Sequence, residues 1–144
     1  MKTLKSFFVV IMALVVITID VMAIESATIG GQDIIANNGV EQKIAINISD
    51  NPGIMGYKLS ITYPQNVKVL SIERGQLCQE GLFDSSLENH SDNKIDVVWS
   101  GTQNTIGDGS LFYINLIADS AAVGEELKIS YSIDDSFDES WNSV

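Results

Sequence analysis

The chain has 144 residues and a formal net charge of −11, with 8 Lys and Arg against 19 Asp and Glu. This length predicts one domain, and a hydrophobic content of 45% is enough to build its core. The acidity excludes nucleic acid and anionic membrane surfaces as partners, and the single Cys and single His exclude an intramolecular disulfide and multi-residue zinc motifs. We therefore expect an acidic, single-domain binding protein.

The first 23 residues have the layout of a secretory signal peptide. Two lysines form a basic start, and an apolar run follows from Phe7 to Ile19. The run stops at Asp20, short of the ~20 apolar residues that span a bilayer. We expect cleavage after Ala23, with Ala27 as the alternative site, and a secreted, extracellular product that is free or attached to the cell surface.

From residue 26 onward, apolar and polar residues alternate with the period of β-strands, and no window has helical periodicity. The clearest alternating runs are Tyr57–Tyr63, Ile95–Trp99, Phe112–Ala118 and Leu127–Ile133. Turns rich in Gly, Asn and Asp separate the runs. Many short alternating strands predict an all-β antiparallel sandwich, and we assign residues 26–144 to this one domain.

The Ile95–Trp99 strand can be oriented in two ways, because a one-residue register shift exchanges the side chains that face the core with those that face solvent. We place Ile95, Val97 and Trp99 in the core, since the alternative buries the carboxylate of Asp96. Cys78 lies in a Gly-rich stretch, where we expect a buried, small hydrophobic side chain.

No part of the chain indicates catalysis, so we expect a protein that is not an enzyme. The sequence contains no nucleophile, phosphate-binding or zinc motif, and His90 lies among polar residues typical of a solvated turn. The acidic segment Asp134–Glu139 lacks the Gly and the ligand spacing of a calcium loop. We interpret it as solvated surface and expect no metal or cofactor on this chain.

The segment Asn51–Tyr63, NPGIMGYKLSITY, resembles the third-strand signature of cohesin modules, the dockerin-binding domains of cellulosomal scaffoldins. Further segments resemble the family pattern in the expected order, and they are Ala27–Gly30, Gly39–Ile48, Lys94–Trp99, Asp108–Phe112 and Ala121–Gly124. The resemblance implies a nine-stranded jelly-roll β-sandwich. It also implies a non-catalytic module that recruits dockerin-bearing enzymes or scaffold proteins in extracellular cellulose or hemicellulose degradation, with calcium on the dockerin partner.

The chain departs from the family pattern at three places. Pro64 stands where the family usually has an Asp after the Tyr, which affects the capping of that turn and not the fold. Gly56 and Lys58 stand where one large cohesin subgroup has an Asn and an Asp that contact dockerin, so that subgroup's specificity does not carry over. Family members also continue into a last strand that pairs with the first. Trp141–Val144 is either a vestige of that strand or the end of a truncated record. The resemblance places Asp135–Phe137 in a loop after the eighth strand.

The resemblance implies binding through the flat outer face of the sheet that contains the third, fifth, sixth and eighth strands. Alternation along the predicted strands then gives the outward residues. The candidate partner-binding residues are Gly56, Lys58, Ser60, Thr62, Asp96, Val98, Ser100, Lys128, Ser130 and Ser132. Small polar side chains around an apolar point such as Val98 suit a rigid platform for a helix.

Two other functions stay open at this point. A carbohydrate-binding module on a related sandwich needs an exposed line of aromatic side chains, and the predicted outer faces offer mainly Tyr113 and Trp141. A surface adhesin or filament subunit would accept its last strand from a neighbouring copy. Dockerin capture, retention on polysaccharide and self-polymerisation distinguish the three functions.

Overall fold

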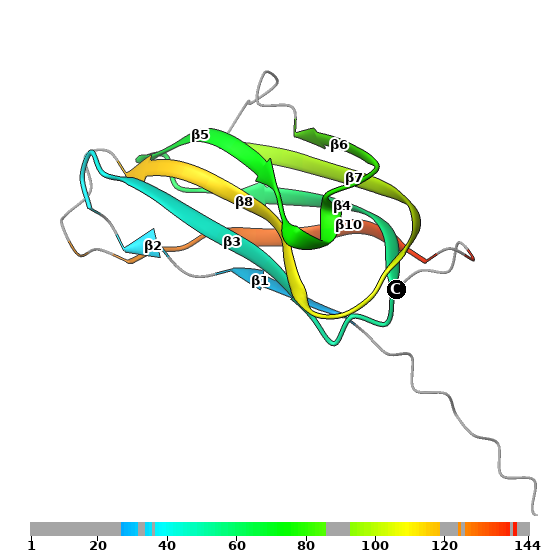
Figure 1. The fold of residues 1–144 in the computed structure, drawn as a ribbon. Coiled ribbons are helices and arrows are strands. Elements are labelled where there is room, and N and C mark those ends of the chain that lie inside the picture. Colours follow the sequence, from blue (N-terminus) through cyan, green and yellow to red (C-terminus); the bar gives the residue numbers. More distant parts are fainter. Residues whose placement is uncertain are drawn as a thin grey trace, which may run out of the picture.

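The protein is described by a computed structural model that covers residues 27–31, 34–35, 37–85, 93–118, 124, 126–138 and 140. Two four-stranded antiparallel sheets pack face to face (Figure 1). The first has the order β1-β3-β8-β5, formed by Thr28–Gly31, Glu41–Ser49, Gly109–Ala118 and Val67–Arg74. The second has the order β10-β4-β7-β6, formed by Ser130–Phe137, Ile54–Thr62, Lys94–Thr105 and Leu82–Ser85.

Two small elements complete the described fold. The strands β2 (Ile34–Ile35) and β9 (Glu126–Leu127) pair with each other, and a short 3-10 helix, η1 (Gln76–Cys78), follows β5. No helix within the described ranges is long and apolar enough to cross a membrane. The expected all-β sandwich is confirmed, whereas the predicted signal peptide and the segment Trp141–Val144 lie outside the described residues.

The alternating runs build the core between the two sheets. Ile95, Val97 and Trp99 are all buried, so the orientation chosen for this strand is confirmed. Tyr57 of β4 lies between Trp99 of β7 and Phe112 of β8, with ring centroids 5.8 and 6.3 Å apart. Tilted aromatic contacts at these distances add to the energy of apolar burial. The three rings therefore hold the two sheets together.

Cys78, at the end of η1, is buried as expected. Its Sγ lies 3.8 Å from the hydroxyl oxygen of Tyr57. Burial raises the pKa of the Cys78 thiol to about 11 and also raises the pKa of Tyr57. Both groups are therefore neutral in the folded protein at physiological pH.

Alkaline pH should weaken the fold through Cys78. The folded-state pKa of the thiol lies above its ordinary value of 9.0, so its contribution to stability is complete below pH 9 and falls as pH rises through about 11. At pH 11 the loss should be about 2 kcal/mol. Urea unfolding at pH 8 and pH 11 measures it, and Cys78→Ala should lose that much less between the two values. Equal losses of stability in the unmodified protein and in Cys78→Ala would show that the Cys78 thiol is not the cause.

The last described strand differs from two expectations. The run Leu127–Ile133 is not one strand, because Leu127 pairs with β2 whereas Ser130 begins β10. Lys128 therefore lies, exposed, between β9 and β10 and not on the predicted outer face. Residues Asp135–Phe137, expected in a loop, are instead the end of β10. A register irregularity between Ile133 and Asp135 absorbs one residue and lets the strand continue along β4.

Candidate partner-binding site

The outer face of the sheet β10-β4-β7-β6 is ordered in four rows, because residues paired across antiparallel strands point to the same side. The first row is Leu82, Ser100, Gly56 and Phe137, and the second is Asp84, Val98 and Lys58. The third row is Asp96 and Ser60, and the fourth is Lys94, Thr62 and Ser130. On β10, the backbone positions of Asp135 and Ser132 pair with Lys58 and Ser60. These positions together are named the platform below.

The first row of the platform is apolar at both ends. Leu82 is 80% exposed. Gly56, predicted as an exposed contact, is instead buried, because the ring of Phe137 occupies the space that a Cβ at Gly56 would need. Phe137 thus provides the surface at this point. Phe137 is absent from the predicted contact residues because the sequence places Asp135–Phe137 in a loop.

Charged groups gather around Asp96 in the third row. The Ser60 hydroxyl donates to Oδ1 of Asp96 at 2.7 Å, and the ammonium groups of Lys58 and Lys94 each lie 3.8 Å from an Asp96 oxygen. Ser60 is only 3% exposed, so the prediction that it is an exposed contact residue is wrong. Exposed ion pairs contribute little to stability, so this cluster orients charges on the surface more than it holds the fold.

Val98 is an apolar point near the middle of the platform. It is 40% exposed, and its neighbours in the second row are Asp84 on β6 and Lys58 on β4. An apolar centre surrounded by polar and charged groups is the arrangement found in protein interfaces. The platform therefore combines a hydrogen-bonded sheet with an apolar centre and one apolar edge.

The remaining predicted residues lie on the platform, with Lys128 as the exception. Thr62 and Ser130 are exposed at paired positions of the fourth row, and Ser100 is half-buried in the first. Ser132 occupies the position opposite Ser60. The strand pairing thus brings together positions from four separate segments of the sequence.

The outer face of the other sheet is chemically different. Lys43 donates to Glu73 at 2.6 Å and lies 4.5 Å from the ring centre of Tyr113. Asn115 donates to Glu73 at 2.5 Å and to Ser71 at 2.8 Å. The hydrogen bonds from Lys43 and then Asn115 hold the pKa of the Glu73 carboxyl below its ordinary value. These polar groups therefore bind one another across the outer face of this sheet.

The part of the chain that the structure describes contains no group of three or more His, Cys, Asp and Glu side chains placed to hold a metal ion. His90 lies outside the described residues.

A family model for the cohesin domain matches residues 17–142 of the chain. The chain belongs to the cohesin family. Cohesin is a non-catalytic binding module, so this protein is not an enzyme. The resemblance to cohesin modules that the sequence indicates is thereby confirmed for the family and for the fold.

Solved structures of cohesins share this fold. A non-cellulosomal cohesin from the archaeon Archaeoglobus fulgidus is 26% identical, with a TM-score of 0.72 and 82% of each chain covered. A Coh-OlpA–Doc918 complex, a type I cohesin–dockerin complex from Clostridium thermocellum, is 18% identical, with a TM-score of 0.72 and coverage of 83% of this chain and 91% of that one.

The sixth cohesin of scaffoldin B from Acetivibrio cellulolyticus, in complex with a Cel5 dockerin, is 21% identical to this chain. Its TM-score is 0.73, and the match covers 82% of this chain and 90% of that one. No curated protein sequence matches the chain.

Proposed function

We propose that this cohesin binds dockerin modules through the platform. The observation that carries the proposal is the exposed Val98 near the centre of a four-row surface, with the charged residues Asp84 and Lys58 on either side of it. Membership of the cohesin family and the similarity to cohesins in complex with dockerins support it. Phe137 and Leu82 extend the apolar contact to one edge of this surface.

The size of the platform suits a helical partner. Its four rows are two residues apart along the strands, about 6.8 Å each, which gives a length of about 20 Å. A helix of about 13 residues covers that distance at about 1.5 Å per residue. A standard interface buries about 1,600 Å² in total, half of it on each partner. We expect a dockerin helix to lie across the rows with its apolar side over Val98.

Calorimetric titration with purified dockerin modules tests the proposal. Binding should require calcium, because the dockerin partner is expected to need calcium to fold, and chelation should release it. Binding of this chain to insoluble cellulose or xylan in place of any dockerin would favour the carbohydrate-binding alternative. Polymerisation that depends on the concentration of the chain alone would favour the filament alternative.

We further propose that the recruited dockerins belong to enzymes that degrade cellulose or hemicellulose outside the cell. The predicted signal peptide over residues 1–23 and the similarity to a scaffoldin cohesin in complex with a Cel5 dockerin support this role. The archaeal relative is described as non-cellulosomal, so the class of enzyme needs its own test. Mass spectrometry of dockerin-bearing proteins captured from the culture medium should find mainly polysaccharide-degrading enzymes. Capture of other dockerin-bearing proteins would contradict this role and leave dockerin binding intact.

A further inference from the structure

The edge strand β6 presents an apolar and an acidic side chain on the same face of the platform. Leu82 and Asp84 are two residues apart, so their side chains point to the same side, about 6.8 Å apart along the strand. Leu82 is the most exposed large hydrophobic side chain of the described residues, and Asp84 is exposed as well. Because β6 is the last strand of its sheet, both side chains lie at the border of the platform (Figure 1).

Asp96 and Asp84 both face outward, but their surroundings differ. Asp96 accepts a hydrogen bond from the Ser60 hydroxyl at 2.7 Å. Two ammonium groups, those of Lys58 and Lys94, each lie 3.8 Å from its oxygens. Asp84, in contrast, makes no hydrogen bond or ion pair with any other residue that the structure describes. A carboxylate accepts hydrogen bonds through both oxygens, so Asp84 offers a negative charge and two acceptors to a partner molecule.

The backbone that enters β6 is fixed by side chains from two neighbouring segments. Arg74 donates to the carbonyl of Gly81, directly before β6, at 2.9 Å, and its guanidinium lies 5.4 Å from the ring centre of Phe83. The Trp99 indole donates to the carbonyl of Glu80 at 2.8 Å. The outward side chains of β6 therefore project from a backbone that is fixed before a partner binds, which lowers the entropic cost of binding.

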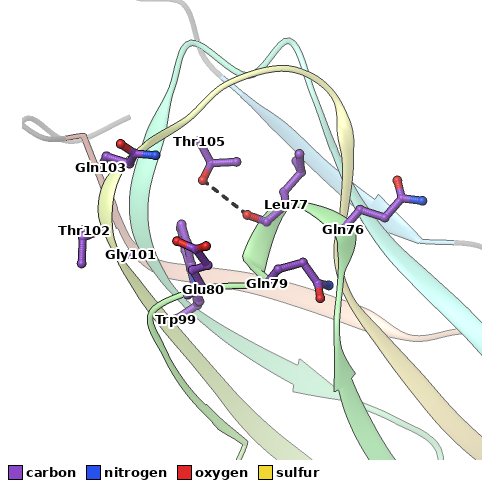
Figure 2. A pocket seen from close by; sticks show the side chains of 9 residues that line it. All are labelled: Gln76, Leu77, Gln79, Glu80, Trp99, Gly101, Thr102, Gln103 and Thr105. Carbon is purple, nitrogen blue, oxygen red and sulfur yellow. Dashed lines mark hydrogen bonds between the residues drawn. The ribbon is translucent and has the colours of Figure 1, made fainter.

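The helix η1, which precedes β6, is anchored to β7 in a similar way. Between Ser100 and Thr105, the register of β7 with β4 skips residues 101–104, and this segment without partners on β4 is called the excursion of β7. Where β7 rejoins β4, the Thr105 hydroxyl donates to the carbonyl of Leu77 in η1 at 3.3 Å (Figure 2). Both η1 and β6 are thus bound to β7, so the edge of the platform is one connected unit.

We propose that Leu82 and Asp84 together bind one basic side chain of the dockerin, an Arg in preference to a Lys. The apolar stem of that side chain packs along Leu82, and its charged head binds the carboxylate of Asp84. An Arg binds a carboxylate through two parallel hydrogen bonds, which a Lys cannot form, so Arg gives the tighter complex. This inference rests on the proposed function, because it concerns a dockerin helix that lies over Val98.

The position of β6 suits a side chain on the flank of that helix. Adjacent strands are about 4.8 Å apart, so Asp84 lies about that distance to one side of Val98. A helix with its side chains is about 10–12 Å wide, so a helix centred over Val98 has one flank above β6. The favoured dockerins therefore carry a basic residue within one helical turn of the apolar residue that covers Val98.

Calorimetric titration of Asp84→Asn, with a dockerin that binds the unmodified protein, tests the charge. The change keeps the size of the side chain and should weaken binding at least about fivefold. The affinity of the variant should also fall less between about 0.1 and 0.5 M NaCl, because a charge pair that salt screens is lost. Asp50→Asn is the matched control, since Asp50 is exposed, lies outside the platform and has a φ of 53°, which Asn also adopts. It should bind within about twofold of the unmodified protein.

Leu82→Ala tests the apolar part of the site. The substitution removes the surface on which the stem of the basic side chain packs, and it should weaken dockerin binding at least about threefold. Ile106→Ala is the matched control, because Ile106 is 76% exposed, similar to Leu82, and lies outside the platform. It should leave the affinity within about twofold. Equal losses from the two substitutions would contradict a specific role of Leu82.

A double-mutant cycle identifies the basic side chain on the partner. Each Arg and Lys of the dockerin is changed to Ala in turn, and each variant is titrated against the unmodified cohesin and against Asp84→Asn. One dockerin variant should lose at least about fivefold in affinity for the unmodified protein and less than about twofold for Asp84→Asn.

The proposal is overturned if Asp84→Asn binds as tightly as the unmodified protein, or if no basic residue of the dockerin depends on Asp84 in this cycle. In either case the dockerin still binds the unmodified protein, so the proposed function is not affected. If no dockerin binds the unmodified protein, the proposed function and this inference fail together.

Discussion

Gly75→Ala is expected to lower the free energy of unfolding by at least about 3 kcal/mol. Gly75 is buried between β5 and η1, and its N–H donates to the carbonyl of Leu111 at 2.8 Å. A Cβ at this position would overlap the backbone of Ser110 and Leu111. Because these atoms belong to the central strand β8, the clash cannot be relieved by a side-chain rotation. Urea unfolding of the variant measures the loss.

Gly30→Ala is the matched control for this experiment. Gly30 lies in β1, at the edge of the same sheet, and a Cβ there would meet nothing within 4 Å. The change should alter the free energy of unfolding by less than about 1 kcal/mol. Equal losses from the two substitutions would show that the close approach at Gly75 is not the cause.

Val98→Asp is expected to weaken dockerin binding at least about 100-fold, or about 2.7 kcal/mol. The change removes the apolar centre of the platform. It also places a carboxylate at the point that the apolar side of the partner is expected to cover, and a charge buried there without a partner group is costly. Val98 is already 40% exposed, so the fold should tolerate the substitution. Calorimetric titration with a dockerin measures the effect, and thermal unfolding checks the fold.

Val40→Asp is the matched control, because it adds the same negative charge at a position outside the platform. Val40 is 46% exposed, similar to Val98, but it precedes β3 and lies outside the platform. Dockerin affinity should stay within about twofold of the unmodified protein. If both variants weaken binding equally, net charge and not the platform is responsible. Unchanged binding by Val98→Asp would place the dockerin on another surface.

The sequence predicted the core well because one energetic argument decides the register. Burial of Asp96 would cost more than burial of Trp99 gains, so the alternation around Val97 has one acceptable orientation. The same argument places Tyr57 inside and Lys58 outside. Alternation therefore predicted which face of β4 and β7 points outward.

The errors arise where alternation is interrupted. The irregularity between Ile133 and Asp135 shifts the pattern by one residue, and no residue type in the sequence marks it. It brings Phe137 over Gly56, so a residue expected in a loop covers one expected to be a contact. Lys128 was misplaced because a continuous pattern does not show that β9 and β10 belong to different sheets.

Two features of the structure that the sequence does not predict depend on pairing between strands that are far apart in the chain. The strand β6, Leu82–Ser85, has only four residues, too few for a reliable periodic signal, and only its pairing with β7 makes Leu82 and Asp84 part of the platform. The interruption of the β4–β7 register between Ser100 and Thr105 likewise shows only in the pairing of the two strands. Neither feature is a property of a local segment.

The excursion of β7 also makes this cohesin a convenient scaffold for engineering. Within a paired strand, one added residue would turn all later side chains to the opposite face. Residues 101–104 lie outside the ladder, whereas Lys94–Ser100 hold the platform and Thr105 re-enters the sheet beside Ile54. Peptides can therefore be inserted at this segment without turning Val98 or Asp96 away from the platform. One molecule could then carry a new loop while it keeps its partner-binding surface.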